Sequence, residues 1–159
     1  ITMMKVYHPS TVMVGTPDTM HSRSFLDLGS GFYVTTLEKQ AIDYAQRFII
    51  RGHNAYINIY EMCDDLCELK VLSFDSYNEE WLDFVSECRA GRIQGDWDII
   101  RGGIANDKVF RTLDLYFSGD IGKEDALRRL VYERPNYQIC FRTQLAIDKC
   151  LTYIDYKRL

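Results

Sequence analysis

The sequence predicts a single domain of the α+β class. Its 159 residues are about one average domain in length, and with 47% hydrophobic and 26% charged residues it has the composition of a globular chain. Helical and strand periodicities alternate along the whole length without an internal repeat. The strands are short and their connections unequal, which favours α+β over a regular doubly wound sheet. We expect residues 1–159 to form this domain, with residues 1–3 as a cloning remnant or a disordered start.

The first half of the chain reads as four strands and one helix. Alternating apolar residues predict strands at residues 4–8, 31–35, 55–61 and 70–74. A polar loop with Gly15 and Pro17 separates the first two. The series Thr35-Thr36-Leu37-Glu38 is typical of a capping box, and the apolar stripe after it predicts a helix that ends before Gly52.

The second half reads mainly as helices. Apolar positions at helical spacing predict a helix at 78–89, stopped by Gly91, and Asn106 can cap another at 108–116. The remaining predicted elements are a buried strand at 97–101, a helix at 123–130, a strand at 137–141, a short helix at 143–150 and a last strand at 151–156.

Composition excludes several classes of protein. With 19 Lys+Arg against 23 Asp+Glu the net charge is −4, so we expect no broad nucleic-acid-binding surface. The five cysteines form no CxxC pair, which argues against a disulfide framework or a four-cysteine zinc site and favours a cytoplasmic location. The three histidines have no metal-ligand spacing, so we expect no metal. We also expect no membrane segment, because no apolar run approaches ~20 residues.

The usual enzyme motifs are absent as well. The sequence has no GxxxxGK[ST] phosphate loop, no GxGxxG, no HExxH and no GxSxG. Nucleotide kinases, Rossmann oxidoreductases, zincins and common serine hydrolases are therefore excluded.

Two stretches combine residues that suit ligand binding. In the first, a strand ends at His8 and is followed by Pro9 and Ser10. In the second, a glycine-flanked strand carries Tyr33 and leads into the helix that carries Tyr44. The two tyrosines could hold a flat aromatic ligand between their faces. Each residue also has an ordinary structural interpretation: a histidine satisfied by backbone, a half-buried strand tyrosine and a core tyrosine.

The order of these motifs resembles a known family. The series is Tyr7-His8-x-Ser10, Asp27-x-Gly29-x-Gly31-Phe32-Tyr33-x-Thr35 with Gln40-Ala41, Ala105-Asn106-Asp107-x-Val109 and Gln138-Ile139-Cys140-Phe141. It resembles a bacterial family of uncharacterised proteins grouped with the ADP-ribosyltransferase superfamily, over residues 5 to about 149. Its first half is also similar to the nicotinamide site of poly(ADP-ribose) polymerases and diphtheria toxin.

The resemblance implies an ADP-ribosyltransferase-like split sheet with flanking helices and NAD as co-substrate. His8 would hydrogen-bond the adenosine-side ribose with Ser10 beside it, and backbone next to His8 would hold the nicotinamide amide. Tyr33 and Tyr44 would sandwich the nicotinamide ring. The third catalytic position, near the nicotinamide ribose, would be Gln138.

The remaining implied positions lie in loops. Gly29 and Gly31 would let the backbone pass close to the ligand. Arg23 is a candidate partner of the NAD pyrophosphate, with a solvated loop arginine as the alternative. Asn106 and Asp107 could bind phosphate or acceptor groups, and the alternative is a helix N-cap.

Two residues depart from the pattern. Pro9 stands where the histidine is usually followed by glycine, and it has no N–H to offer the ligand. Gln138 is neutral where many relatives have Glu, so it cannot act as a base. A strand amide that satisfies a neighbour is the alternative for Gln138.

We therefore expect an NAD-dependent mono-ADP-ribosyltransferase that modifies a macromolecule rather than one that elongates a chain. It would suit a bacterial toxin of a toxin–antitoxin or phage-defence system, with an antitoxin protein as partner. The alternatives are an NAD glycohydrolase and a non-catalytic NAD-sensing or protein-interaction module on the same fold.

Overall fold

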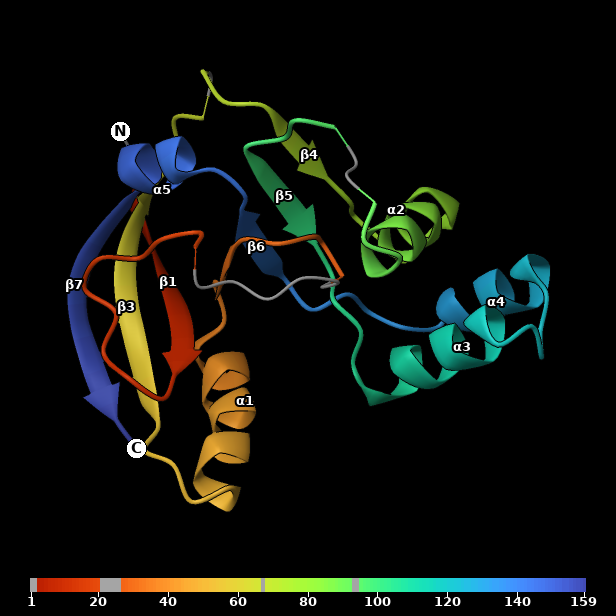
Figure 1. Cartoon of the computed structure of the whole chain (residues 1–159), viewed down its shortest axis with the longest axis horizontal. Helices are drawn as coiled ribbons and strands as arrows, with labels where there is room; N and C mark the ends of the chain where they lie inside the picture. The colour runs from red at the N-terminus through yellow and green to blue at the C-terminus, as the bar shows by residue number, and fades with distance from the viewer. Residues whose placement is uncertain (1–2, 21–26, 67, 93–94) are drawn as a thin grey trace.

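A computed structural model of the chain describes residues 3–20, 27–66, 68–92 and 95–159, and Figure 1 shows its course. In these ranges it is a mixed α+β structure with five helices and one seven-stranded sheet, in which the strand order is β4-β5-β6-β2-β1-β3-β7. The α+β class predicted from the sequence is therefore confirmed.

One side of the sheet is built from long strands. The strands β1, β3 and β7 lie side by side, with α1 next to β1 and α5 at the end where β7 begins (Figure 1). All three strands are eight residues long and pair antiparallel. The elements of this side are β1 (Met3–Ser10), α1 (Glu38–Ile50), β3 (Tyr56–Cys63), α5 (Gln144–Cys150) and β7 (Leu151–Arg158).

The other side combines short strands with three helices. Here β5 pairs with β4 in parallel and with β6 antiparallel, and α2, α3 and α4 lie beyond them (Figure 1). The elements are β4 (Val71–Ser73), α2 (Glu79–Arg89), β5 (Ile99–Gly102), α3 (Asp107–Phe117), α4 (Lys123–Leu130) and β6 (Gln138–Phe141).

The two sides meet at β2 (Phe32–Thr35). This strand pairs with β6 along all four of its residues, from Phe32 opposite Phe141 to Thr35 opposite Gln138. It pairs with β1 only where Thr35 faces Tyr7. The sheet is therefore continuous in hydrogen bonding but joined in the middle by a single residue pair.

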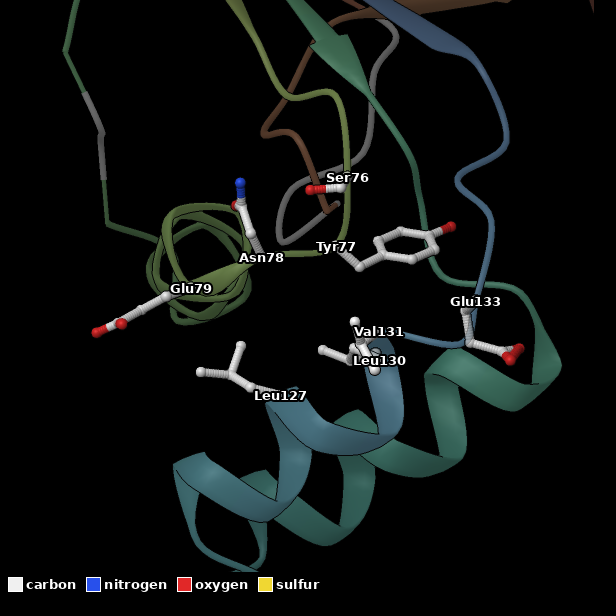
Figure 2. Close-up of a pocket in the computed structure, with 8 residues that line it drawn as sticks. All are labelled: Ser76, Tyr77, Asn78, Glu79, Leu127, Leu130, Val131 and Glu133. Carbon is white, nitrogen blue, oxygen red and sulfur yellow. The ribbon is translucent and has the colours of Figure 1, made fainter.

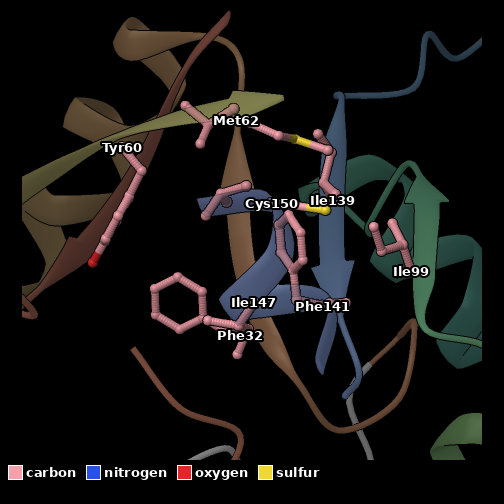
Figure 3. Packing of buried hydrophobic residues seen from close by; sticks show 11 residues of the cluster. Phe32, Tyr60, Met62, Ile99, Ile139, Phe141, Ile147 and Cys150 are labelled. Atoms are coloured by element: carbon pink, nitrogen blue, oxygen red, sulfur yellow. The ribbon is translucent and has the colours of Figure 1, made fainter. Parts of the chain in front are cut away.

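Of two large buried clusters, the first joins the two sides and the second lies within one of them. The first lies between the sheet and α5 and includes Phe32, Tyr60, Phe141 and Ile147, as Figure 3 shows. The second lies among α2, α3 and α4 and is built around Trp81. Its other buried members are Tyr77, Leu82, Val85, Val109, Leu113, Ala126 and Leu130.

The predicted helices and strands are all present, with boundaries that differ by at most two residues. The predicted capping box is wrong. The helix α1 starts at Glu38 with Leu37 in the N-cap position and no side-chain cap. Thr35 is held in β2 and its hydroxyl accepts from the Leu37 N–H at 3.1 Å, while the Glu38 carboxylate binds Lys157 of β7 at 2.8 Å. Both side chains of the expected box thus have other partners.

Candidate functional site

The junction of β1 and β2 brings together two of the residues predicted for the site. His8 lies in β1, and its Nδ1 donates a hydrogen bond to the backbone carbonyl of Tyr33 in β2 at 2.6 Å. The imidazole stacks on the ring of Phe32, with ring centres 4.2 Å apart and planes 30° apart. The half-buried ring therefore has one fixed orientation.

The surroundings of His8 keep it neutral. Burial lowers the pKa of His8 from 6.5 to about 4, although the hydrogen bond to the Tyr33 carbonyl opposes this shift. A carbonyl oxygen can only accept, so the proton of the neutral ring must be on Nδ1. The lone pair is then on Nε2, which has no hydrogen-bond partner among the described residues. His8 can therefore accept a hydrogen bond from a hydroxyl.

The carbonyl of His8 and the loop after β1 are held by a residue of β3 that was not predicted for the site from the sequence. Asn58 of β3 is fully buried, and its Nδ2 donates to the carbonyls of His8 at 3.3 Å and Val12 at 3.2 Å. Its Oδ1 accepts from the Val14 N–H at 2.9 Å. An amide inside a predicted strand rich in apolar residues was the signal that could have identified it.

Pro9 and Ser10 continue β1 beyond His8. Pro9 pairs with Ile57 and Ser10 with Tyr56 in the ladder to β3. The Ser10 hydroxyl accepts from the Val12 N–H at 3.3 Å, which turns the chain after the strand. Both predicted binding residues thus lie next to His8 in sequence and in the strand.

Tyr33 fixes the glycine-rich turn that precedes β2. Its hydroxyl donates to the carbonyl of Gly29 at 2.6 Å and accepts from the Leu28 N–H at 3.1 Å. Burial raises the pKa of Tyr33 above its ordinary value, so the hydroxyl keeps its proton. Since the ring is half-buried and its hydroxyl is bound to the turn, only part of its face is open to a ligand.

The two glycines of this turn have structural reasons of their own. Gly29 has a φ of +87°, in the left-handed region that side chains rarely adopt. At Gly31, a Cβ would lie 2.6 Å from both the Cys140 Sγ and the Phe141 carbonyl oxygen. The close pairing of β2 with β6 therefore requires glycine at position 31.

Tyr44 contacts its own helix. Its ring meets Phe48 edge-on at 5.8 Å, and the Arg47 guanidinium lies 4.8 Å from its centre. None of the ring contacts among the described residues joins Tyr44 to Tyr33. The structure thus brings His8 and Tyr33 together but shows no pairing of the two tyrosines.

Gln138 lies two strands away from β1 along one row of the sheet. It faces Thr35 of β2 on one side and Gly102 of β5 on the other, and Thr35 in turn faces Tyr7. Its side chain is half-buried and forms no hydrogen bond with the described residues. His8 directly follows Tyr7 in β1, so one strand, β2, separates Gln138 from the strand that carries the histidine.

The Asp27 and Ala105 motifs are joined in the structure. Asp27 forms an ion pair with Arg89 of α2 at 2.6 Å and accepts from the Ala105 N–H at 2.7 Å. The Asn106 side chain accepts from the Val109 N–H at 2.9 Å, so the helix-cap interpretation of Asn106 is confirmed. Asp107 begins α3, and its side chain lies outside the described set, as does all of Arg23.

Arg142, at the end of β6, is a second residue that the sequence analysis missed. Its guanidinium lies close to the glycine turn. A Cβ added to Gly29 would be 3.3 Å from the Arg142 Cζ. Its Nη1 is buried and has no hydrogen-bond partner in the part of the chain that the structure describes. An arginine directly after the predicted strand at 137–141 was the only sequence signal.

Two surface cavities lie elsewhere. One of about 290 Å³ lies between residues 76–79 and the end of α4 (Figure 2), and one of about 300 Å³ lies between residues 15–17 and α5. Neither is lined by a residue predicted for the site.

The described part of the chain contains no group of three or more His, Cys, Asp or Glu side chains that could hold a metal ion. Within the same residues, no helix has the length and apolar character needed to cross a membrane.

Comparison with protein families identifies one match. The model of a family described as a protein of unknown function, DUF3990, matches residues 4–153. The chain belongs to this family. The match spans β1 to β7 and therefore includes His8, Tyr33 and Gln138. No curated protein and no solved structure matches the chain.

Proposed function

We propose that this DUF3990 protein binds NAD at the junction of β1 and β2 and transfers its ADP-ribose to a macromolecular acceptor. The observation that carries the proposal is the neutral His8, with Nδ1 bound to the Tyr33 carbonyl and a lone pair on Nε2 that no described residue binds. The single-pair joint between β1 and β2 supports a split, ADP-ribosyltransferase-like sheet. The proposal that the acceptor is a macromolecule rests on the sequence resemblance.

The reaction asks little acid–base chemistry of the protein. The bond between nicotinamide and the ribose C1′ breaks with both electrons leaving on the ring nitrogen, which neutralises the cationic nicotinamide. The ribose is left as an oxocarbenium, which a nucleophile of the acceptor captures as it loses its proton to solvent. The site must mainly orient the dinucleotide and place polar oxygens near the developing charge.

His8 is suited to the orienting role. A neutral imidazole with a free Nε2 accepts a hydrogen bond from a ribose hydroxyl, and its stacking on Phe32 prevents rotation. A cationic imidazole would lose that acceptor. The burial that keeps the pKa of His8 near 4 thus preserves the form that binds a hydroxyl.

The surrounding groups supply the rest of the proposed site. The Arg142 guanidinium beside the Gly29 turn places positive charge near β2, which suits the diphosphate of NAD. The Gln138 amide can hydrogen-bond a ribose hydroxyl from the other side of β2. In this proposal Tyr33 offers the open part of its ring to the nicotinamide, and Tyr44 the second face.

The neutral amide of Gln138 favours two alternatives. Without a carboxylate to activate an acceptor, water could capture the oxocarbenium, which would make the protein an NAD glycohydrolase. The same neutrality, together with the missing N–H of Pro9, would suit a module that binds NAD without cleaving it.

Labelled NAD tests these possibilities. The purified chain is incubated with adenylate-labelled NAD and bacterial lysate, and labelled macromolecules, free ADP-ribose and nicotinamide are measured. We expect His8→Ala to reduce macromolecular labelling at least tenfold, because the ribose loses its acceptor. The matched control is His53→Ala, which removes an exposed histidine and should label like the wild type.

Each other outcome rejects part or all of the proposal. Equal labelling by the wild type and His8→Ala would remove His8 from the reaction. Nicotinamide release with free ADP-ribose as the product, unaffected by lysate, would indicate the glycohydrolase. Calorimetric binding of NAD without nicotinamide release would indicate the sensing module, and absence of binding would reject all three functions.

A further inference from the structure

The end of β3 and the start of β7 bring two cysteines together. Cys63 is the last residue of β3, and Cys150 directly precedes β7. The two strands run antiparallel, and Met62 opposite Leu151 is the last pair of the ladder at this end. Cys63 and Cys150, the last residue of α5, each directly adjoin that pair.

The side chains are also neighbours. The Cys63 Sγ lies 3.9 Å from the carbonyl oxygen of Lys149, the residue before Cys150, and the Cys63 thiol is close enough to raise the pKa of Cys150. Both side chains pack against the cluster between the sheet and α5, where Figure 3 shows Cys150 next to the β-sheet core. The two thiols therefore belong to the same packed region at one end of the sheet.

The two cysteines differ in access. Cys150 is only 2% exposed, and burial together with its neighbour Cys63 raises the pKa of its thiol to about 12. Cys63 is half-buried, so an oxidant in solution can reach it first. This is the arrangement of an accessible attacking thiol with a buried resolving thiol behind it.

We propose that Cys63 and Cys150 form a reversible intramolecular disulfide with a low-molecular-weight disulfide as the oxidant. The Cys63 thiolate attacks one sulfur of the oxidant, and the other sulfur leaves as a thiolate. The Cys150 thiol then loses its proton and attacks the Cys63 sulfur, which expels the second small thiolate. Two electrons and two protons leave the protein, and the oxidant becomes two thiols.

The bond would join distant parts of the chain. It closes a covalent loop from residue 63 to 150, which contains β4, β5, β6 and all of α2 to α5. A cross-link over so long a segment restricts the unfolded chain strongly. The oxidised protein should therefore unfold at a higher temperature than the reduced one. This inference is independent of the proposed NAD chemistry.

Thiol mapping tests the proposal on the full chain. The reduced, folded protein is incubated with oxidised glutathione, free thiols are alkylated, and peptides are analysed by mass spectrometry without reduction. We expect a cross-linked peptide pair containing Cys63 and Cys150 with the loss of two hydrogens, reversed by dithiothreitol. A higher melting temperature should accompany it.

Three variants complete the experiment. Cys63→Ser and Cys150→Ala should each abolish the cross-link and the rise in melting temperature. Cys88→Ser is the matched control, since Cys88 is buried in a different cluster, and it should leave both unchanged. A link from Cys63 to Cys67, a persistent glutathione adduct on Cys63, or four unmodified thiols at positions 63, 88, 140 and 150 would each overturn the proposal. If a variant fails to fold, the peptide map of the oxidised wild-type protein still tests the proposal by itself.

Discussion

The side of the molecule around β1, β3 and β7 and the side around α2, α3 and α4 differ in the polar contacts of their buried residues. In the first, buried polar groups bind backbone: Asn58 binds three backbone groups, the Tyr60 hydroxyl donates to the Val14 carbonyl at 2.5 Å, and His8 binds the Tyr33 carbonyl. In the second, the cluster around Trp81 is mainly apolar, and only the ring donors of Tyr77 and Trp81 bind backbone among its described members.

The difference shows which contacts fix the positions of side chains and which contacts stabilise the fold. Hydrogen bonds from buried side chains to backbone have a direction, so they fix the loop after β1 and the orientation of His8. Burial of apolar surface has no direction, and it contributes most to the free energy of folding. The candidate site lies beside β1, where directional hydrogen bonds fix the geometry, and apolar clusters on both sides of the molecule supply stability.

The largest effect should come from the apolar side. Trp81 is fully buried, and its Nε1 donates to the Gly103 carbonyl at 2.8 Å. Trp81→Ala should lower the free energy of unfolding by about 3–5 kcal/mol, because it removes the largest side chain of the cluster and leaves a cavity. Urea denaturation measures this loss. Trp97→Ala, at a half-buried position, is the control and should cost clearly less; equal losses would contradict the comparison.

The second effect tests the polar side. Asn58→Leu keeps the size of the side chain but leaves the Val14 N–H and the carbonyls of His8 and Val12 without their partner. We expect the free energy of unfolding to fall by about 2–4 kcal/mol. Asn54→Leu is the control, since Asn54 is exposed and its side chain accepts a hydrogen bond from the exposed Arg158, and should change stability by less than about 0.5 kcal/mol. If Asn58→Leu changed the free energy of unfolding as little as its control, the buried hydrogen bonds of Asn58 would not stabilise this region.

The smallest effect concerns the pH dependence of His8. Its pKa is about 4 in the folded protein and 6.5 when exposed, so between these values the unfolded chain binds the additional proton. Stability from this group is complete above pH 6.5 and is lost as the pH falls towards 4. We expect a loss of about 2 kcal/mol over this range, allowing for partial solvent exposure of the ring. His8→Gln should show a correspondingly smaller pH dependence in urea denaturation, whereas His53→Gln should follow the wild type. Parallel curves for the wild type and His8→Gln would show that His8 is not desolvated.

Much of the local structure follows from the sequence because its signals are local. The helix of residues 79–89 has apolar residues at helical spacing and an asparagine before it, and the Asn78 side chain indeed accepts from the Trp81 N–H. Asn106 caps α3 for the same reason. The capping box at residues 35–38 failed because tertiary contacts competed with it: Lys157, more than a hundred residues away, binds Glu38.

The candidate site was only partly predictable. His8 and Tyr33 were selected, but the direct bond between them depends on the alignment of β1 with β2, which the sequence does not show. The glycines were selected as ligand contacts, whereas Gly31 is required by the approach of Cys140 and Phe141. Asn58 and Arg142 were missed because their importance depends on residues distant in sequence.

The sequence by itself determined the α+β class, the order of helices and strands, and the residue types available for chemistry, since periodicity and capping act over a few positions. Only the tertiary structure decided the strand order of the sheet, the single-pair joint between β1 and β2 and the neutral state of His8. The physical reason is that strand alignment and desolvation arise from contacts between segments far apart in the chain. The two cysteines at positions 63 and 150, which adjoin the last pair of the β3–β7 ladder, are brought together by the same alignment.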